Sequence, residues 1–366
     1  MLLQVGNSGG QRWQQLMKNK FALASIILIA VALFCAIFAY WISPDSSTNA
    51  DLQTVEIQAK KPGYSQLFLR LPIKNSSSNN LFRTLFFGQK SQYHFIPITG
   101  YQIAGDSLII QKYVDEDTAV TQSYFIPKIL YQNKNIQHYI ITKKYWLGTD
   151  TFGRDILSRI ILGTRVSLAV GLIAVLISLP VGIFLGAIAG YFGGWVNKGV
   201  MLLVNVTWSI PTLLLVFAIT LALGKGFWQI FMAVGLTMWV NVARLVRGQV
   251  MAVKETEYIQ AAKALGFSNG RIIARHILPN IMGPLMVIAA SNFASAIVIE
   301  AGLSFLGIGI QPPHPSWGLM IKENYNFVIT HNPMLALAPG IAIMILVLAF
   351  NILGNALRDA LDVKQL

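Results

Sequence analysis

The chain has 366 residues, of which 54% are hydrophobic and 12% charged, about half the charged fraction of a soluble domain. This composition excludes an ordinary soluble enzyme and indicates a protein that crosses a membrane several times. The net charge of +13 does not indicate nucleic-acid binding, because the basic residues lie mainly between apolar runs, where positive charge sets membrane orientation. The single cysteine, Cys35, excludes a disulfide or a cysteine-based metal site within the chain.

The first part of the chain contains one apolar run followed by a long polar stretch. Residues 1–20 are basic and predict a cytoplasmic N-terminus, and residues 21–42 predict the first transmembrane helix, ending at the interfacial pair Tyr40 and Trp41. Residues 43–146 are polar, with period-two alternation in 93–99 and 107–114. They predict an extracytoplasmic insert that is either β-rich or partly disordered.

Residues 147–166 predict an amphipathic helix at the membrane surface. Ile156, Leu157, Ile160 and Ile161 fall on one helical face, and charged residues such as Arg154 and Arg159 fall elsewhere.

Residues 167–366 predict a membrane core with five more transmembrane helices, at about 167–191, 200–223, 227–245, 281–301 and 335–353. Gly182, Gly186 and Gly190 recur every four residues in the first of these, which favours close helix packing. Pro211 predicts a kink in the next. Polar residues within the core either line a water-filled path or bond one helix to another, and the sequence leaves both open for Asn205, Asn241, Ser291 and Asn292.

The loop 246–280 is a polar, basic segment between two apolar runs. Its charges require water or a partner protein, because hydrocarbon cannot solvate them. The pattern predicts a short helix from Glu257, a corner at Gly266, and a second helix over about 269–277 that Pro279 stops. This loop is the short loop richest in Lys and Arg, so we expect it in the cytoplasm, together with both termini.

Motifs for chemistry are missing from the sequence. There is no GxxxxGK[ST] phosphate-binding loop, and the five histidines lack metal-ligand spacing, so we expect no catalytic residue, metal or cofactor in this chain. Glu300 lies within an apolar run, where a carboxylate is either a proton-relay group or is satisfied structurally near the end of its helix.

Three separated segments resemble one family. Glu257-Tyr-Ile-Gln-Ala261-Ala262-Lys-Ala-Leu-Gly266, followed by His276-Ile-Leu-Pro279-Asn280, resembles the EAA loop of ABC-importer permease subunits. Segments 147–159 and 303–318 are similar to those of the C-type permease of the dipeptide, oligopeptide and nickel importers. The resemblance implies an all-α polytopic protein of the bacterial inner membrane, with six transmembrane helices of the ABC-importer permease type. The insert, roughly 51–143, is much longer than the usual connection in that family.

The resemblance also implies partners and site residues. The partners would be a homologous B-type permease that completes the pore, two cytoplasmic ATPase subunits that bind ATP and Mg, an extracytoplasmic peptide-binding protein and membrane lipid. The implied ATPase-coupling residues are Glu257, Ala261, Ala262, Gly266 and Pro279. The family motifs expected at the outer face comprise Gly148, Asp150, Gly153, Arg154, Asp155, Pro312, Pro313, Trp317 and Gly318.

The leading hypothesis is therefore the permease subunit of an ATP-driven, binding-protein-dependent importer of di- or oligopeptides. One alternative is a permease of the same family for nickel or another small solute. Two others come from different classes: an ion-coupled carrier centred on Glu300, and a membrane-anchored sensor or enzyme whose active part is the insert.

Overall fold

The computed structural model describes residues 16–361 except 74–80, 127–135, 225 and 331. Most of the predicted cytoplasmic N-terminus, residues 1–15, and the last residues, 362–366, lie outside the described residues. The chain divides into two compact units. The insert unit comprises residues 33–166 and 312–342, and the helical unit comprises residues 1–32, 167–311 and 343–366.

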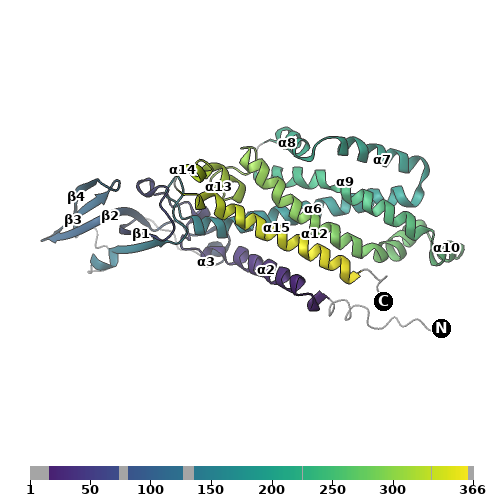
Figure 1. Cartoon of the computed structure of the whole chain (residues 1–366), viewed down its shortest axis with the longest axis horizontal. Helices are drawn as coiled ribbons and strands as arrows, with labels where there is room; N and C mark the ends of the chain where they lie inside the picture. The colour runs from purple at the N-terminus through teal and green to yellow at the C-terminus, as the bar shows by residue number, and fades with distance from the viewer. Residues whose placement is uncertain (1–15, 74–80, 127–135, 225, 331, 362–366) are drawn as a thin grey trace. The chain divides into compact units, whose positions relative to one another are not determined.

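The insert unit is built on an antiparallel sheet of five strands in the order β4-β3-β2-β1-β5 (Figure 1). The strands are β1 Tyr64–Pro72, β2 Tyr93–Ala104, β3 Ser107–Tyr113, β4 Ala119–Phe125 and β5 Ile140–Tyr145. Alternate residues face opposite sides, so Leu69 joins one apolar cluster with Ile98 and Ile110, whereas Phe68 joins another with Ile57 and Tyr145. The prediction of a β-rich insert is confirmed.

Along the chain, short helices precede, separate and follow the strands of this sheet. They are α3 Ala39–Ile42, η1 Thr48–Ala50, η2 Val55–Ile57, α4 Leu81–Phe87, η3 Ile136–Tyr139, α13 Trp317–Asn324 and α14 Phe327–Thr330. The two C-terminal ones, α13 and α14, lie far along the chain from the strands and belong to the same unit.

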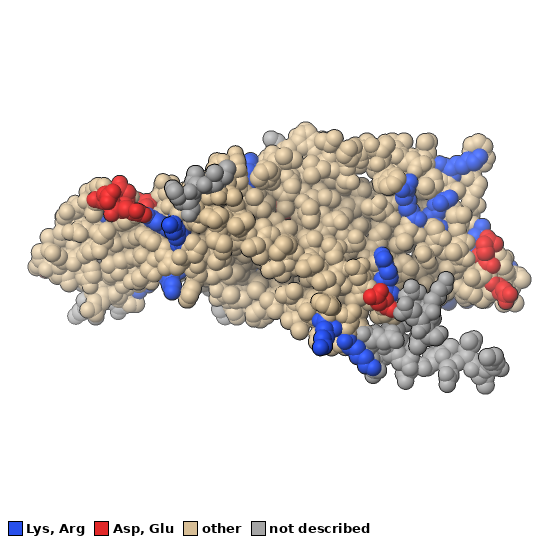
Figure 2. Space-filling view, viewed as in Figure 1, with Lys and Arg blue, Asp and Glu red and all other residues tan. Residues whose placement is uncertain are grey.

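The helical unit carries the apolar helices α2 Lys20–Ile37, α6 Ile156–Phe192, α9 Phe227–Lys254, α12 Met282–Phe305 and α15 Met334–Leu361, of which α2, α6 and α15 extend into the insert unit. Within the described residues, five helices are long and apolar enough to cross a membrane, or six if a bent pair counts as one. Helix α9 packs against α7 Gly194–Ser209, α8 Thr212–Leu223 and α12. On the face shown in Figure 2, charged side chains of this unit gather toward the end with α10 Glu257–Ala264 and the C-terminus of α15, and the middle of the helices is nearly bare of charge.

The predicted third span is broken rather than kinked. Helices α7 and α8 meet at an angle of 95°. Pro211 disfavours helical conformation in the residue before it, and Ile210 is extended, with φ −92° and ψ 127°. Residues 200–223 therefore form two helices and not one.

Helix α9 contains the predicted fourth span, residues 227–245, and extends past it. Helix α9 continues to Lys254, because Val242, Val246 and Val250 keep an apolar face buried past the predicted end. A helix does not need hydrocarbon around it to continue when one face packs on protein.

The predicted surface helix over 147–166 is wrong in two respects. The helix α6 begins only at Ile156 and runs without interruption to Phe192. In addition, Arg154, Asp155 and Arg159 are buried rather than solvated. Opposite charges satisfy one another inside this unit, which a helical-wheel argument cannot detect.

Candidate functional site

The coupling loop predicted from sequence contains a short helix with well-defined ends. Helix α10, Glu257–Ala264, begins after Thr256, and Glu257 in its first turn is favourable to the helix dipole. At the other end Gly266 has φ +77°, its N–H bonds to the carbonyl of Lys263, and the N–H of Phe267 bonds to the carbonyl of Ala262. This Schellman ending favours glycine, because a side chain at that φ is strained.

One face of α10 packs on its own unit. Ile259 and Ala262 are buried in an apolar cluster with α9 and with the segment after α10, which includes Val246, Val250, Ile272, Ile277 and Ile281. Ala262 had been predicted to touch a partner. The structure directs it inward, so its small side chain lets α10 approach its own core closely and is not available to a partner.

The opposite face of α10 is open. Glu257, Gln260, Ala261 and Gly266 are exposed, and so is Leu265, with 74% of its surface accessible. Leu265 was missed by the sequence argument. Its signal was a large apolar residue within a polar segment, directly before the glycine that ends the helix.

Hydrogen bonds join α10 to the segment after it, and that segment to the end of α6. The Asn280 amide donates to the Tyr258 hydroxyl at 2.6 Å, and the Tyr191 hydroxyl at the end of α6 donates to Asn269 at 2.8 Å. The loop is thereby a packed, cross-linked element rather than a loose connection.

The segment after Gly266 continues into the next membrane helix. Helix α11 Asn269–Ile272, the π-helical turn η4 Ile273–Ile277 and the 3-10 turn η5 Leu278–Ile281 lead directly into α12. Pro279, which is exposed, had been expected to stop the second helix. It does not, because the widened turn accommodates it: the N–H of Leu278 reaches back five residues to the carbonyl of Ile273.

In the insert unit, the motif residues meet in a buried ion cluster. Arg154 contacts three carboxylates, through Nε to Asp150 at 2.6 Å, Nη2 to Glu323 at 2.7 Å and Nη1 to Asp51 at 3.3 Å. Arg159 faces the same three oxygens through the same nitrogens at 3.6–4.0 Å. Arg159 is fully buried and its guanidinium makes no hydrogen bond with another described residue. Asp51 and Glu323 were not predicted.

Burial and charge act in opposite directions on this cluster. Burial alone would lower the pKa of Arg154, but the carboxylates of Asp150 and Glu323 raise it above its ordinary value. Burial raises the pKa of Asp155, although the backbone N–H of Ser158 donates to its carboxylate at 2.8 Å. The cluster thus joins the start of α6 to α13 through two buried arginines, Asp150, and the partly accessible carboxylates of Asp51 and Glu323.

The two motif glycines lie against backbone. A Cβ at Gly148 would lie 2.2 Å from the carbonyl oxygen of Lys60, and one at Gly153 would lie 1.8 Å from that of Thr54. Thr149 bonds to the same segment, accepting from the N–H of Lys60 at 2.9 Å. The motif therefore packs closely against the backbone of residues 54–60 of the insert.

The C-terminal motif packs on the first turns of α6. Pro312 and Pro313 are joined by a cis peptide bond. Trp317 is buried, its indole N–H donates to the carbonyl of Ile160 at 3.0 Å, and its ring fills the space that a Cβ at Gly163 would need. Gly318 is also buried.

The repeated glycines of α6 face α9. A Cβ at Gly182 would lie 2.4 Å from Val242, one at Gly186 2.5 Å from the carbonyl oxygen of Ala243, and one at Gly190 2.8 Å from that of Arg247.

Glu300 is fully buried near the end of α12. Its carboxylate accepts from the Ser304 hydroxyl at 2.6 Å, and Ser304 in turn accepts from the N–H of Ile310 at 3.0 Å. This chain of bonds holds the turn that follows α12, which is the structural role left open by the sequence. Among the described residues, no group of three or more His, Cys, Asp or Glu is placed to hold a metal ion.

The described residues thus combine apolar helices long enough to cross a membrane with a packed polar loop that has one open face. The chain belongs to the family of binding-protein-dependent transport system inner membrane components, whose model matches residues 182–365. Residues 9–62 match the N-terminal transmembrane domain of oligopeptide transport permease C.

Several relatives are similar over most of their length. The dipeptide transport system permease protein DppC of Alkalihalophilus pseudofirmus is 44% identical over 61% of this chain and 73% of its own. The glutathione transport system permease protein GsiD of Pectobacterium atrosepticum is 41% identical over 60% and 73%. The oligopeptide transport system permease protein OppC of Bacillus subtilis is 39% identical over 61% and 73%. A chain of the inward-facing MetNI methionine ABC transporter aligns with a TM-score of 0.46 at 20% identity, over 56% of this chain and 97% of that one.

Proposed function

We propose that this chain is the C-type permease subunit of an ATP-driven importer of di- or oligopeptides. The observation that carries the proposal is its similarity, at 39–44% identity over 61% of the chain, to permeases of dipeptide and oligopeptide transport systems. The glutathione permeases among the relatives favour the same substrate class, because glutathione is itself a short peptide. A permease for nickel or another small solute is the alternative within the family.

The subunit would work in a complex. A homologous B-type permease would supply the other half of the pore, an extracytoplasmic binding protein would deliver peptide, and two cytoplasmic ATPase subunits would bind ATP and Mg. The loop 246–280 and both termini would lie in the cytoplasm, and residues 43–146 outside. The Lys and Arg content of that loop supports this orientation.

Contact with an ATPase subunit would occur at the open face of α10. Leu265 supplies the apolar anchor of this face, next to Glu257 and Ala261. Burying a leucine contributes about 1.5–3 kcal/mol, or roughly ten- to hundredfold in affinity. The packed inner face and the two tyrosine hydrogen bonds would carry movement of α10 into α12.

The test is Leu265→Glu in the transporter reconstituted with its partner subunits and binding protein. Because the side chain is exposed, we expect normal membrane insertion, at least tenfold slower uptake of a labelled tripeptide, and weaker retention of the ATPase subunits. Leu265→Met is the matched control and should retain both. Normal uptake by Leu265→Glu would mean that this face is not the coupling contact.

A further inference from the structure

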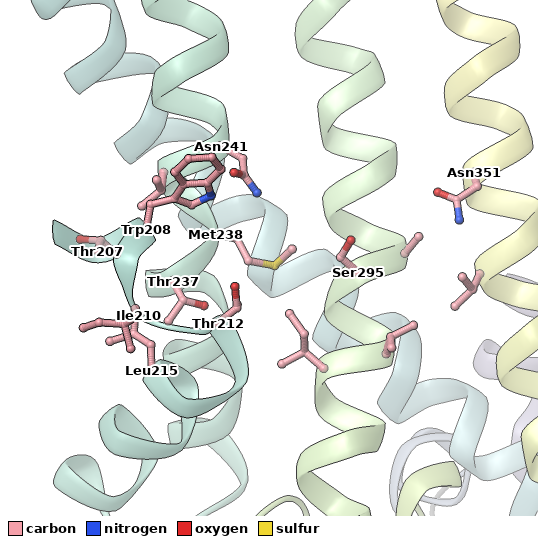
Figure 3. A pocket seen from close by; sticks show the side chains of 15 residues that line it. Thr207, Trp208, Ile210, Thr212, Leu215, Thr237, Met238, Asn241, Ser295 and Asn351 are labelled. Carbon is pink, nitrogen blue, oxygen red and sulfur yellow. The ribbon is translucent and has the colours of Figure 1, made fainter. Parts of the chain in front are cut away.

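A half-open cavity of about 480 Å³ lies within the helical unit, between the bend that joins α7 to α8 and the helices α9, α12 and α15 (Figure 3). Its size is that of a site for a small organic molecule. None of the described residues that line it is charged. The inference drawn from it deepens the function proposed above and depends on it.

Polar but uncharged side chains face this cavity from several helices. Thr212 comes from the start of α8, Asn241 from α9, Ser295 from α12 and Asn351 from α15. All four are exposed, and none makes a side-chain hydrogen bond with another residue in the part of the chain that the structure describes. The last three lie in the middle third of apolar helices, at a depth where hydrocarbon would leave them unsatisfied.

Asn292 shows what a structural asparagine looks like in the same helix. It lies three residues before Ser295, is 3% exposed, and donates to the Ser178 hydroxyl at 3.4 Å and to the Met238 carbonyl at 3.5 Å. Asn292 therefore bonds one helix to another. Asn241 makes no such bond to another described residue. The sequence left open whether each asparagine lines a path or bonds helices together, and the two residues differ in this respect.

The bend between α7 and α8 adds to the same surface. Trp208, which is 61% exposed, and Ile210 line the cavity where the helix is interrupted. Interrupted backbone at membrane depth is tolerated where it is buried in protein or lines a water-filled space. The indole adds one flat apolar face to a wall that also carries aliphatic side chains such as Val298 and Val347.

We propose that Trp208, Thr212, Asn241, Ser295 and Asn351 form this subunit's share of the peptide-conducting surface, and that they contact the main-chain amides of the passing peptide. Carboxamides and hydroxyls both donate and accept, so they match the N–H and C=O groups that every peptide presents. A charged wall would hold peptides of opposite charge and repel those of like charge. A neutral wall binds weakly and without regard to side-chain charge, as conduction requires.

The chain offers a clean test by cysteine accessibility, because Cys35 is its only cysteine. In a Cys35→Ala background, Asn241→Cys, Ser295→Cys and Asn351→Cys are each assembled with the partner subunits in proteoliposomes and treated with a membrane-impermeant thiosulfonate. We expect labelling at all three positions, slowed at least threefold by trialanine together with its binding protein and a non-hydrolysable ATP analogue. Asn292→Cys is the matched control and should not be labelled.

A second measurement tests the recognition of main chain. Asn241→Leu and Asn351→Leu should each slow uptake of the tripeptides Ala-Ala-Ala, Ala-Lys-Ala and Ala-Glu-Ala by about the same factor, three- to tenfold. Stimulation of ATP hydrolysis by the loaded binding protein should persist, which separates this effect from uncoupling or misfolding.

The outcomes distinguish this inference from the proposed function. If the unaltered transporter takes up none of the three peptides, the peptide function itself is wrong. If it takes them up while Asn241→Cys, Ser295→Cys and Asn351→Cys resist labelling, or while the leucine variants lose uptake of only one charge type, the proposed surface is wrong.

Discussion

Two buried arginines in one cluster contribute unequally to the stability of the insert unit. Arg154 and Arg159 face the same oxygens of Asp51, Asp150 and Glu323, but only Arg154 is within hydrogen-bond distance of them. Removing one partner of a buried ion pair is expensive because it leaves uncompensated charge. Loss of Arg154 should therefore lower the stability of the protein more than loss of Arg159.

We expect Arg154→Met to destabilise the protein by about 3–5 kcal/mol, the usual cost of breaking a buried ion pair. Arg159→Met should cost less, since Arg159 donates no hydrogen bond to a described residue and lies against the like charge of Arg154. The melting temperatures of the two purified variants, compared with that of the exposed Arg275→Met, measure the difference. Equal losses, or a larger loss for Arg159→Met, would contradict this account.

The sequence identified the motif residues Asp150 and Arg154 but not what they contact. Their partners Asp51 and Glu323 lie about one hundred and more residues away in the chain, and no local pattern announces them. The same limit applies to Ala262, because the EAA pattern does not say which face of α10 turns inward. Only packing against α9 and the segment that follows decides it.

At the scale of the helix, the α6–α9 contact depends on the absence of side chains. The ridge of Gly182, Gly186 and Gly190 places backbone and valine side chains of α9 where a Cβ would stand. Close approach of this kind is how helices associate where the hydrophobic effect is absent.

Gly186→Ala should lower the melting temperature and the yield of folded protein, because its Cβ would meet the carbonyl oxygen of Ala243. Overpacking of this kind costs about 1–3 kcal/mol. Gly248→Ala in α9 is the matched control: nothing lies within 4 Å of its Cβ position. It should be neutral or stabilising by up to about 1 kcal/mol, since alanine favours helix. Similar behaviour of the two variants would show that the ridge is not a close contact.

Helix boundaries were the part of the fold least accessible to sequence. Pro211 was expected to kink a helix and instead separates two, whereas Pro279 was expected to stop a helix and is accommodated within one. A proline removes one donor in either case. The chain adopts an extended residue at Ile210 and a widened turn before Pro279. Which of the two forms depends on the packing of neighbouring helices, and the local sequence carries no information about that packing.

At the scale of the whole chain, composition and charge predicted the membrane class, and alternation predicted the β-rich insert. The order of its five strands was not predictable, because register and neighbours depend on pairings between distant residues. The orientation of the chain in the membrane remains a prediction from the distribution of Lys and Arg.

That orientation predicts opposite labelling of two exposed sites. In a Cys35→Ala background, Tyr101→Cys in β2 should react with an impermeant maleimide in right-side-out vesicles, and Leu265→Cys only in inside-out vesicles. Both side chains are exposed in this chain, so in vesicles stripped of the ATPase subunits, which we propose cover Leu265, a failure to react reports sidedness rather than burial. Labelling of Tyr101→Cys in inside-out vesicles alone would invert the proposed topology.

The helical segment Asn269–Phe305, which comprises α11, η4, η5 and α12, has a mechanical consequence if it moves as one body. At 1.5 Å per residue such a segment is about 55 Å long, so a tilt of about 5° at its α10 end displaces its far end by roughly 5 Å. Ser295, part of the way along, would move by about 3 Å, enough to break a hydrogen bond to a bound molecule. A small rotation imposed at the α10 end would thus loosen a peptide held at Ser295, as proposed above, without any loop having to open.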